Sequence, residues 1–243
     1  MKVEILGARG NIPLRAPRYT RHSGVLIDGT ILLDLGEPSY VRRRPRWIFI
    51  THLHPDHAAL GAASVITSEA RDSLFATGEK DHVSAALYLP ERSRLAPAAR
   101  VIRQPVRVGV HRVIPVPTQH AVNARSVGYI VERGSRRIFY SSDLFAIHRR
   151  YYPRLGRLDL VITDGSFMRR GGLVRVDPKT GKRFGHAGIP DLVDLFSRFT
   201  RRIVFTHFGS WFYADIAESI RRIEALGNGV KVGAARDGLV IRV

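Results

Sequence analysis

The chain has 243 residues, of which 44% are hydrophobic, so it can supply a sizeable buried core. It contains no cysteine, which excludes disulfides and thiolate metal sites and leaves histidine and carboxylate side chains as the strong metal ligands. The formal net charge of +18 would attract polyanions such as nucleic acid, but a general arginine bias would give the same charge, so composition favours neither explanation.

The N-terminal part is predicted to form antiparallel sheet. A Gly- and Pro-containing loop, residues 7–13, is long enough to reach over a site, although an ordinary connection explains it equally well. Asp28-Gly29 has the composition of a hairpin turn. Strands are expected at residues 2–6, 23–27 and 30–34.

Four potential metal ligands follow the apolar run Trp47–Ile50, which is typical of a buried strand. They are His52, His54, Asp56 and His57. Imidazole nitrogens and carboxylate oxygens suit zinc, and this set exceeds the needs of one closed tetrahedral site. The stretch therefore predicts two metal ions at the end of this strand.

The segment after this motif is harder to interpret. Residues 57–63 and 68–76 are predicted to be helical, and residues 78–100 to be irregular because Pro90 and Pro97 interrupt a weak periodicity. Strands are expected to resume near residues 100–103 and 112–116.

A hairpin is predicted in the middle of the chain. Its strands are Ser126–Val131 and Arg137–Tyr140. His120 precedes the hairpin and Asp143 follows it.

The last third of the chain alternates strands with amphipathic helices. A helix is predicted from the apolar positions Ile189, Leu192, Val193, Phe196 and Phe199, and another from Ile216, Ile220, Ile223 and Leu226, closed by Gly227. Strands are expected at Leu158–Ile162, at Arg202–His207, which ends in Thr-His as Trp47–His52 does, and at Leu239–Val243. Strand-rich segments followed by helices, twice over, predict an α/β protein: an αββα sandwich of two mixed sheets with helices outside, in a single domain of residues 1–243.

The arrangement His-x-His-x-Asp-His after a strand resembles the signature of the metallo-β-lactamase-fold hydrolases. That resemblance implies one metal held by His52, His54 and His120, a second held by Asp56, His57 and His207, and Asp143 as the bridge. Two such ions lower the pKa of a shared water and provide a hydroxide that attacks the substrate. Zinc is the expected metal, with manganese or iron as alternatives. His22, His82, His111 and His148 lie outside the ligand pattern.

The second half of the chain resembles the ribonuclease Z branch of this family at Thr163–Phe167, at Gly185-His186 and at Thr206–Ser210. The resemblance implies that His186 contacts the scissile phosphate and that Asp164 orients it, so the predicted catalytic residues are Asp56, Asp164 and His186. The branch has Glu at the position of Asp164 and Ser-Thr at Ala187-Gly188.

The expected substrate is a small or single-stranded phosphodiester, RNA or DNA included. His120 and Asp143 are joined by one tight hairpin, which leaves no room for the tRNA-binding arm that one branch carries there. Residues 168–185 are instead expected to form a basic lip that holds phosphates electrostatically. Its cations are Arg169, Arg170, Arg175, Lys179, Lys182 and Arg183, of which Arg169, Arg170, Lys182 and Arg183 are the predicted substrate-binding residues.

Two other functions remain open. A thioesterase or lactonase of the same fold would not need the pair His186 and Asp164, and a nucleic-acid-binding protein could carry a metal site that is not catalytic.

With no signal peptide pattern and no apolar run long enough to span a bilayer, we expect a cytoplasmic protein that needs no membrane. The sequence does not decide between a monomer and a homodimer.

Overall fold

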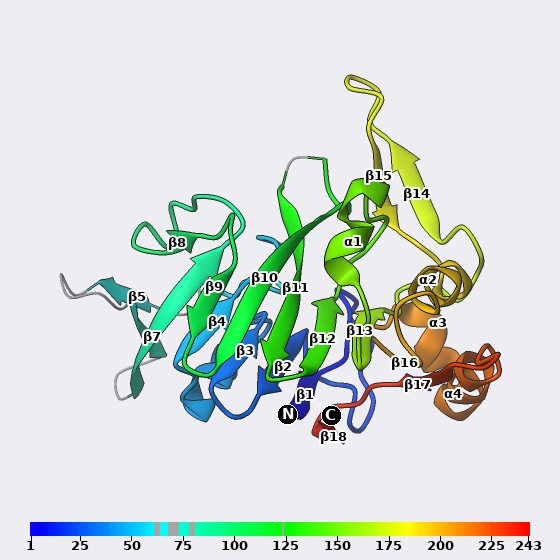
Figure 1. Ribbon diagram of the computed structural model, residues 1–243, viewed down its shortest axis with the longest axis horizontal. Coiled ribbons are helices and arrows are strands. Elements are labelled where there is room, and N and C mark those ends of the chain that lie inside the picture. Colours follow the sequence, from blue (N-terminus) through cyan, green and yellow to red (C-terminus); the bar gives the residue numbers. More distant parts are fainter. Residues whose placement is uncertain (61–63, 68–72, 78–80, 123) are drawn as a thin grey trace.

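The computed structural model describes residues 1–60, 64–67, 73–77, 81–122 and 124–243. Two mixed β-sheets pack face to face and the helices lie on their outer faces (Figure 1). The predicted sandwich is therefore confirmed.

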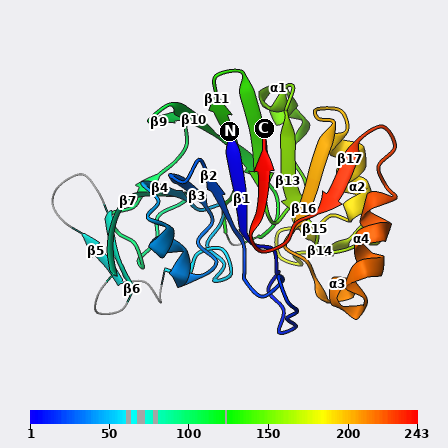
Figure 2. The same cartoon turned by 90° about the horizontal axis from the view of Figure 1, so that it is seen from below.

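The first sheet has the strand order β18-β1-β2-β3-β4-β7-β6-β5, with β8 beside β7. Its strands are β1 (Lys2–Gly7), β2 (Gly24–Ile27), β3 (Ile31–Leu33), β4 (Trp47–Phe49), β5 (Ser64–Thr67), β6 (Ser73–Thr77), β7 (Asp81–Leu89), β8 (Arg100–Val101) and β18 (Leu239–Arg242). Because β1 and β18 pair antiparallel, the two ends of the chain lie side by side (Figure 2).

The second sheet has the order β17-β16-β13-β12-β11-β10-β9, and a separate two-stranded sheet joins β14 to β15. Its strands are β9 (Val106–Val108), β10 (His111–Thr118), β11 (Ser126–Arg133), β12 (Arg136–Ser141), β13 (Leu160–Asp164), β16 (Arg202–Thr206) and β17 (Lys231–Ala234); the small sheet has β14 (Leu173–Val176) and β15 (Arg183–His186). The helices are η1 (Pro38–Arg43), η2 (Arg149–Tyr151), α1 (Tyr152–Leu155), α2 (Ile189–Phe196), α3 (Ser210–Ala214) and α4 (Ile216–Glu224).

Alternating side chains divide the core into layers, as the period of a strand requires. In β2, Val25 and Ile27 belong to the large cluster shared by both sheets. Leu26 belongs to a second cluster with Tyr40 of η1, on the outer face of the first sheet. The outer face of the second sheet packs on α2, where the rings of Phe139 and Phe196 are 5.6 Å apart.

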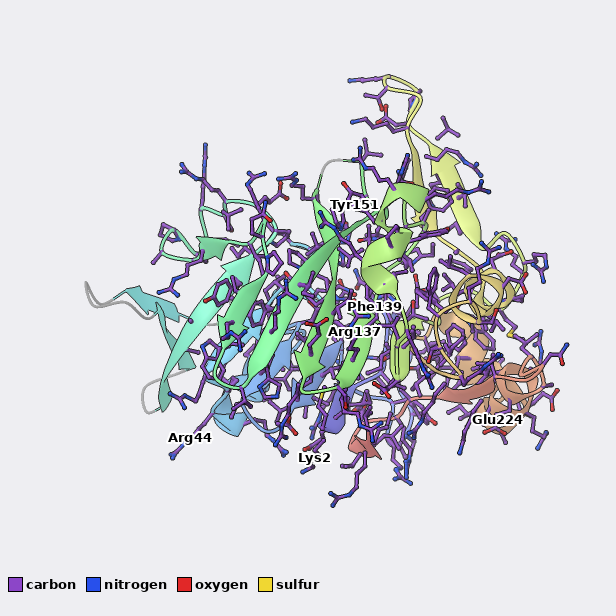
Figure 3. The ribbon with its side chains drawn as sticks, in the orientation of Figure 1. Lys2, Arg44, Arg137, Phe139, Tyr151 and Glu224 are labelled. Carbon is purple, nitrogen blue, oxygen red and sulfur yellow. The ribbon has the colours of Figure 1, made fainter. Side chains whose placement is uncertain are left out.

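The periphery is charged, in contrast to this interior. Lys2, Arg44 and Glu224 are exposed at the edges of the molecule, whereas Phe139 is fully buried (Figure 3). Among the described residues, no helix is long and apolar enough to cross a membrane.

Parallel pairing sets the position of the site. Strand β12 is parallel to β13, β13 is parallel to β16, and in the first sheet β3 is parallel to β4. The carboxyl ends of parallel neighbours meet at the same edge, so the residues that follow these strands are brought together.

The strands expected at both ends of the chain are confirmed, and so is the turn, where Asp28 and Gly29 have φ angles of 47° and 71°. The prediction for the region after the metal motif was wrong. Helices were expected at residues 57–63 and 68–76, but residues 57–60 are not helical and the structure has strands β5 and β6; residues 61–63 and 68–72 lie outside the described residues.

Residues 78–100 were expected to be irregular, yet Asp81–Leu89 is a long strand between β4 and β6; residues 78–80 lie outside the described residues. The sequence of this strand has no clear alternation of polar and apolar residues. Pairing with a neighbour on each side, which the sequence does not display, decides its conformation. Residues 168–185 were expected to form a basic lip, and most of them belong to the β14–β15 hairpin.

Candidate metal centre

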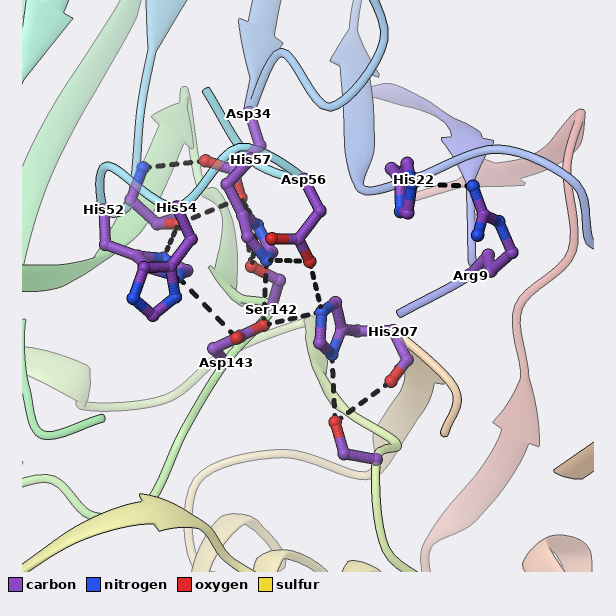
Figure 4. A network of polar contacts seen from close by, with 12 residues as sticks. Arg9, His22, Asp34, His52, His54, Asp56, His57, Ser142, Asp143 and His207 are labelled. Carbon is purple, nitrogen blue, oxygen red and sulfur yellow. Dashed lines mark hydrogen bonds and ion pairs between the residues drawn. The ribbon is translucent and has the colours of Figure 1, made fainter. Parts of the chain in front are cut away.

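Seven side chains predicted as metal ligands meet at the carboxyl ends of the strands. Figure 4 shows Asp143 with five of the others around it. Four of these five come from the His-x-His-x-Asp-His motif in the loop after β4, and the fifth, His207, directly follows β16. The full set is His52, His54, Asp56, His57, His120, Asp143 and His207.

The first group gathers four ligand atoms around one point. The Nδ1 atom of His54 lies 3.0 Å from Nε2 of His52 and 3.4 Å from Nε2 of His120. Asp143 Oδ2 lies 3.3 Å from His120 Nε2 and 3.7 Å from His52 Nε2. Ligands at ordinary zinc distances in a tetrahedron are about 3.3 Å apart, so this spacing fits a zinc ion.

The second group shares Asp143 through its other oxygen. Asp143 Oδ1 lies 3.1 Å from His57 Nε2 and 3.2 Å from His207 Nε2. Asp56 Oδ2 lies 3.2 Å from His57 Nε2 and 3.0 Å from His207 Nε2. One carboxylate thus offers one oxygen to each group, which is the geometry of a bridging ligand.

The chemistry of the donor set fits bound cations. Asp143 Oδ1 and His57 Nε2 are buried and make no hydrogen bond with any described residue, although they face each other. Leaving buried polar atoms without a partner is costly, and a cation between them would remove that cost. The two groups can therefore hold metal ions.

The pKa values of the ligand candidates show that negative charge is concentrated in the site. Burial lowers the pKa of His207, but the nearby carboxylates, Asp143 first, outweigh it and raise that pKa to about 10. Burial opposes ionisation of Asp143 and Asp56, yet the surrounding histidines hold both pKa values well below their usual range. Both carboxylates are therefore ionised at neutral pH.

The second nitrogen of most ligand histidines is held by the protein. His120 Nδ1 donates to the carbonyl of Gly185 at 3.0 Å, and His207 Nδ1 lies 2.9 Å from Ser166 Oγ. His57 Nδ1 lies 3.0 Å from Asp34 Oδ2. Fixing Nδ1 in this way leaves Nε2 free to face an ion.

Asp34 is a supporting residue whose role sequence reasoning missed. It is fully buried with a φ of 61°, and its carboxylate accepts from His57 and from the hydroxyl of Ser142 (Figure 4). It also accepts from the backbone and hydroxyl of Thr51 and from the hydroxyl of Tyr140. The available signal was a single carboxylate between Leu33 and Leu35 at the end of a buried strand.

Replacing Asp34 by asparagine is expected to weaken metal binding by about 10- to 100-fold, because an amide cannot accept as many hydrogen bonds and leaves His57 poorly oriented. Zinc titration with a competing chromogenic chelator measures the change. Asp159→Asn is the matched control, since Asp159 is a partly exposed carboxylate that binds Arg136. Equal zinc affinity in Asp34→Asn and the wild type would exclude this orienting role.

His186 and Asp164 form the predicted pair. His186 Nδ1 lies 2.7 Å from Asp164 Oδ2, and Asp164 also accepts from the backbone of Leu144 and Ser166. Burial lowers the pKa of His186, but the Asp164 carboxylate outweighs it and raises the pKa above its usual value. The aspartate that replaces the branch's glutamate therefore still reaches the histidine.

Strand β15 connects this pair to the metal groups. The N–H of Gly185 donates to the carbonyl of His120 at 2.7 Å, while its own carbonyl accepts from the His120 ring. Gly185 has a φ of 124°, and a Cβ there would lie 2.0 Å from the carbonyl oxygen of Leu173, so only glycine fits.

Two cavities adjoin the centre. The first, about 520 Å³, is lined by His54, His120 and His186 together with Arg175 and Phe184 of the β14–β15 hairpin. The second, about 250 Å³, is also lined by His186, together with His207, Phe167, Trp211 and the segment Gly10–Ile12. The loop at residues 7–13 thus does reach the site, where its backbone pairs with Phe208.

The four arginine and lysine residues predicted to bind substrate are dispersed. Arg169 donates to the carbonyl of Gly172, and Arg170 forms ion pairs with Asp191 and Asp194. Lys182 and Arg183 line a third cavity, outside the two that adjoin the centre. None of the four lines those two cavities in the described part of the chain.

Other histidines have different neighbours. His22 is half-buried beside Arg9, His111 is buried and lies 2.8 Å from an oxygen of Asp28, and His148 caps η2. The side chain of His82 lies outside the described residues.

Comparison with protein families matches residues 33–208 to the β-lactamase superfamily domain. The chain belongs to this superfamily. Comparison with curated proteins gave no match.

Solved structures share the metallo-β-lactamase fold over the whole chain. YhfI from Bacillus subtilis, a metallo-β-lactamase fold protein, has a TM-score of 0.68 and 16% identity, covering 99% of this chain and 98% of that one. A diphosphatase from the PhnP family has a TM-score of 0.66 and 17% identity, covering 100% and 97%. Human tRNase Z, short form, has a TM-score of 0.62 and 20% identity, covering 100% and 99%.

Proposed function

We propose that this chain is a dinuclear metal-dependent hydrolase that cleaves phosphodiesters, with zinc in both positions. The observation that carries the proposal is the 2.7 Å contact between His186 and Asp164, beside the two ligand groups. Seven convergent ligands exceed the four of a structural zinc site, which argues against a metal site without catalysis.

The roles of the residues follow from their positions. When bound, the two ions supply an activated water and positive charge for the reacting oxygens. His186 lines the same cavity as the ligands His54 and His120, so a phosphate there lies within its reach. Protonated His186 can donate to the phosphate or the leaving oxygen, and Asp164 holds the ring and stabilises its charge. Asp56 contributes to catalysis as a ligand.

The proposed substrate is small or single-stranded. His120 and Asp143 are separated by the β11–β12 hairpin with its tight turn at Gly134, and the described residues between them form no arm. The fold also supports several reactions among similar structures, a diphosphatase and a tRNase Z included, so the choice of substrate rests on the site.

A substrate panel tests the proposal. We expect the zinc-loaded protein to hydrolyse a chromogenic phosphodiester and a short single-stranded oligonucleotide, and to process a precursor tRNA poorly. Binding of the oligonucleotide should weaken steeply with salt, because phosphate contacts release counterions. Preferential hydrolysis of a thioester or lactone would refute the phosphodiesterase assignment, and accurate, faster processing of the precursor tRNA would refute the restriction to small substrates.

A further inference from the structure

The β14–β15 hairpin projects from the body of the molecule (Figure 1). Its residues share a cavity with the ligand candidates His54 and His120. In its register, Leu173 pairs with His186 and Arg175 pairs with Phe184. Cross-strand partners and alternate residues share a face, so these four side chains belong to the same side of the hairpin. Arg175 and Phe184 therefore lie next to the catalytic candidate His186 along this face of the hairpin.

The cavities confirm that the hairpin has two different faces. Arg175 and Phe184 line the 520 Å³ cavity with His186 and the metal-ligand candidates. Arg183, the residue between Phe184 and Lys182, lies over the ring of Phe145 at 5.2 Å and lines a separate cavity. Only one face of the hairpin is thus turned toward the centre.

Arg175 is suited to bind an anion. It is exposed, and within the described residues it makes no hydrogen bond or ion pair. It is also the only arginine or lysine among the described residues that line this cavity. Asp177 lies in the same cavity, but its Oδ1 already accepts from the backbone of Lys179 and from Thr180.

Phe184 offers a ring to the same space. Its side chain is half-buried, and in the described part of the chain it forms no stacked or edge contact with another aromatic ring. Two residues along a strand span about 6.6 Å, which is close to the length of one nucleotide unit in an extended single strand. A base next to a phosphate at His186 would therefore lie near this ring.

We propose that this face of the hairpin binds single-stranded nucleic acid: Phe184 stacks on the base beside the scissile phosphate, and Arg175 binds the next phosphate. The inference rests on the proposed phosphodiesterase function and names its substrate class, single-stranded RNA or DNA. Stacking on aromatic rings and cationic phosphate contacts are sequence-tolerant, so cleavage is expected at many sequences.

The test compares two substrates in the zinc-loaded protein: a hexanucleotide, and a chromogenic phosphodiester that has no second phosphate. Arg175→Ala and Phe184→Leu are each expected to lower the ratio of kcat/KM for hexanucleotide over chromogenic diester by about tenfold, a scale given by base stacking and phosphate contacts. Phe184→Trp keeps a flat ring and should retain the wild-type ratio. Arg201→Ala removes the same charge from an exposed position just before β16, at the opposite end of that strand from His207, and should leave the ratio unchanged.

Binding gives a readout that does not depend on turnover. Fluorescence anisotropy of a labelled hexanucleotide with a hydrolysis-resistant backbone measures this affinity. Arg175→Ala and Phe184→Leu should bind it more weakly than the wild type, whereas Phe184→Trp and Arg201→Ala should bind it as the wild type does. Equal affinities for wild type, Arg175→Ala and Phe184→Leu would overturn the inference. It would also be overturned if Arg201→Ala lost as much affinity as Arg175→Ala, or if Phe184→Trp lost as much affinity as Phe184→Leu. If the wild type cleaved no phosphodiester, the proposed function would fail, while the anisotropy series would still decide whether this face binds a single strand.

Discussion

Asp143→Ala is expected to lose metal from both positions and to lower kcat/KM on a phosphodiester by far more than 100-fold. Asp143 offers Oδ2 to the first ligand group and Oδ1 to the second, so one substitution opens both. Loss of a residue that merely orients a ligand already lowers metal affinity or activity by about 10- to 100-fold, so loss of a ligand shared by two ions must lower them further. Elemental analysis after dialysis and steady-state kinetics measure the two effects.

The control for Asp143→Ala is Asp194→Ala, which removes the same charge from an exposed position on α2. Circular dichroism of both variants separates loss of metal from loss of fold. A full complement of two metals per chain in folded Asp143→Ala would contradict the bridging role. His52→Ala should also reduce occupancy and activity, because it removes one ligand of the first group.

His186→Ala is expected to keep its metals while its turnover of a phosphodiester falls by roughly 100-fold or more, the usual contribution of acid–base help. His186 Nδ1 is engaged by Asp164, so its other nitrogen remains for the substrate. Elemental analysis and kcat measured with the chromogenic diester check both parts.

Two outcomes would change this assignment. His186 is also near Asp143 and His207, so loss of metal in His186→Ala would make it a ligand instead. An unchanged rate would favour a thioesterase or lactonase.

The raised pKa of His186 predicts that activity falls as pH rises through that pKa, since the protonated form is the donor. A pH profile of kcat measures this decline, which His186→Ala should lack.

Local patterns in the sequence predicted much of the fold correctly. Alternation and apolar runs located β1, β2, β4, β12 and β16, because a buried strand needs apolar side chains wherever it pairs. They failed in the region of β5, β6 and β7, where pairing between distant segments decides the conformation.

The candidate site was predictable where one short motif carries several ligands. His52, His54, Asp56 and His57 lie within six residues, and no packing requirement explains such a cluster. His120, Asp143, His207 and the pair His186 and Asp164 were found only through the resemblance to a family. Asp34 received no role, because an isolated carboxylate does not show in the sequence which donors will surround it.

The sequence by itself determined the ligand chemistry, the strand endings that present it, and the absence of thiolates and disulfides. Only the tertiary structure decided which oxygen of Asp143 faces which group, that Asp164 still reaches His186, and that Arg175, not Arg170, faces the cavity. The physical reason is that residue type fixes what a side chain can bind, whereas the parallel register of β12, β13 and β16 and the pairing of β14 with β15 fix what it meets.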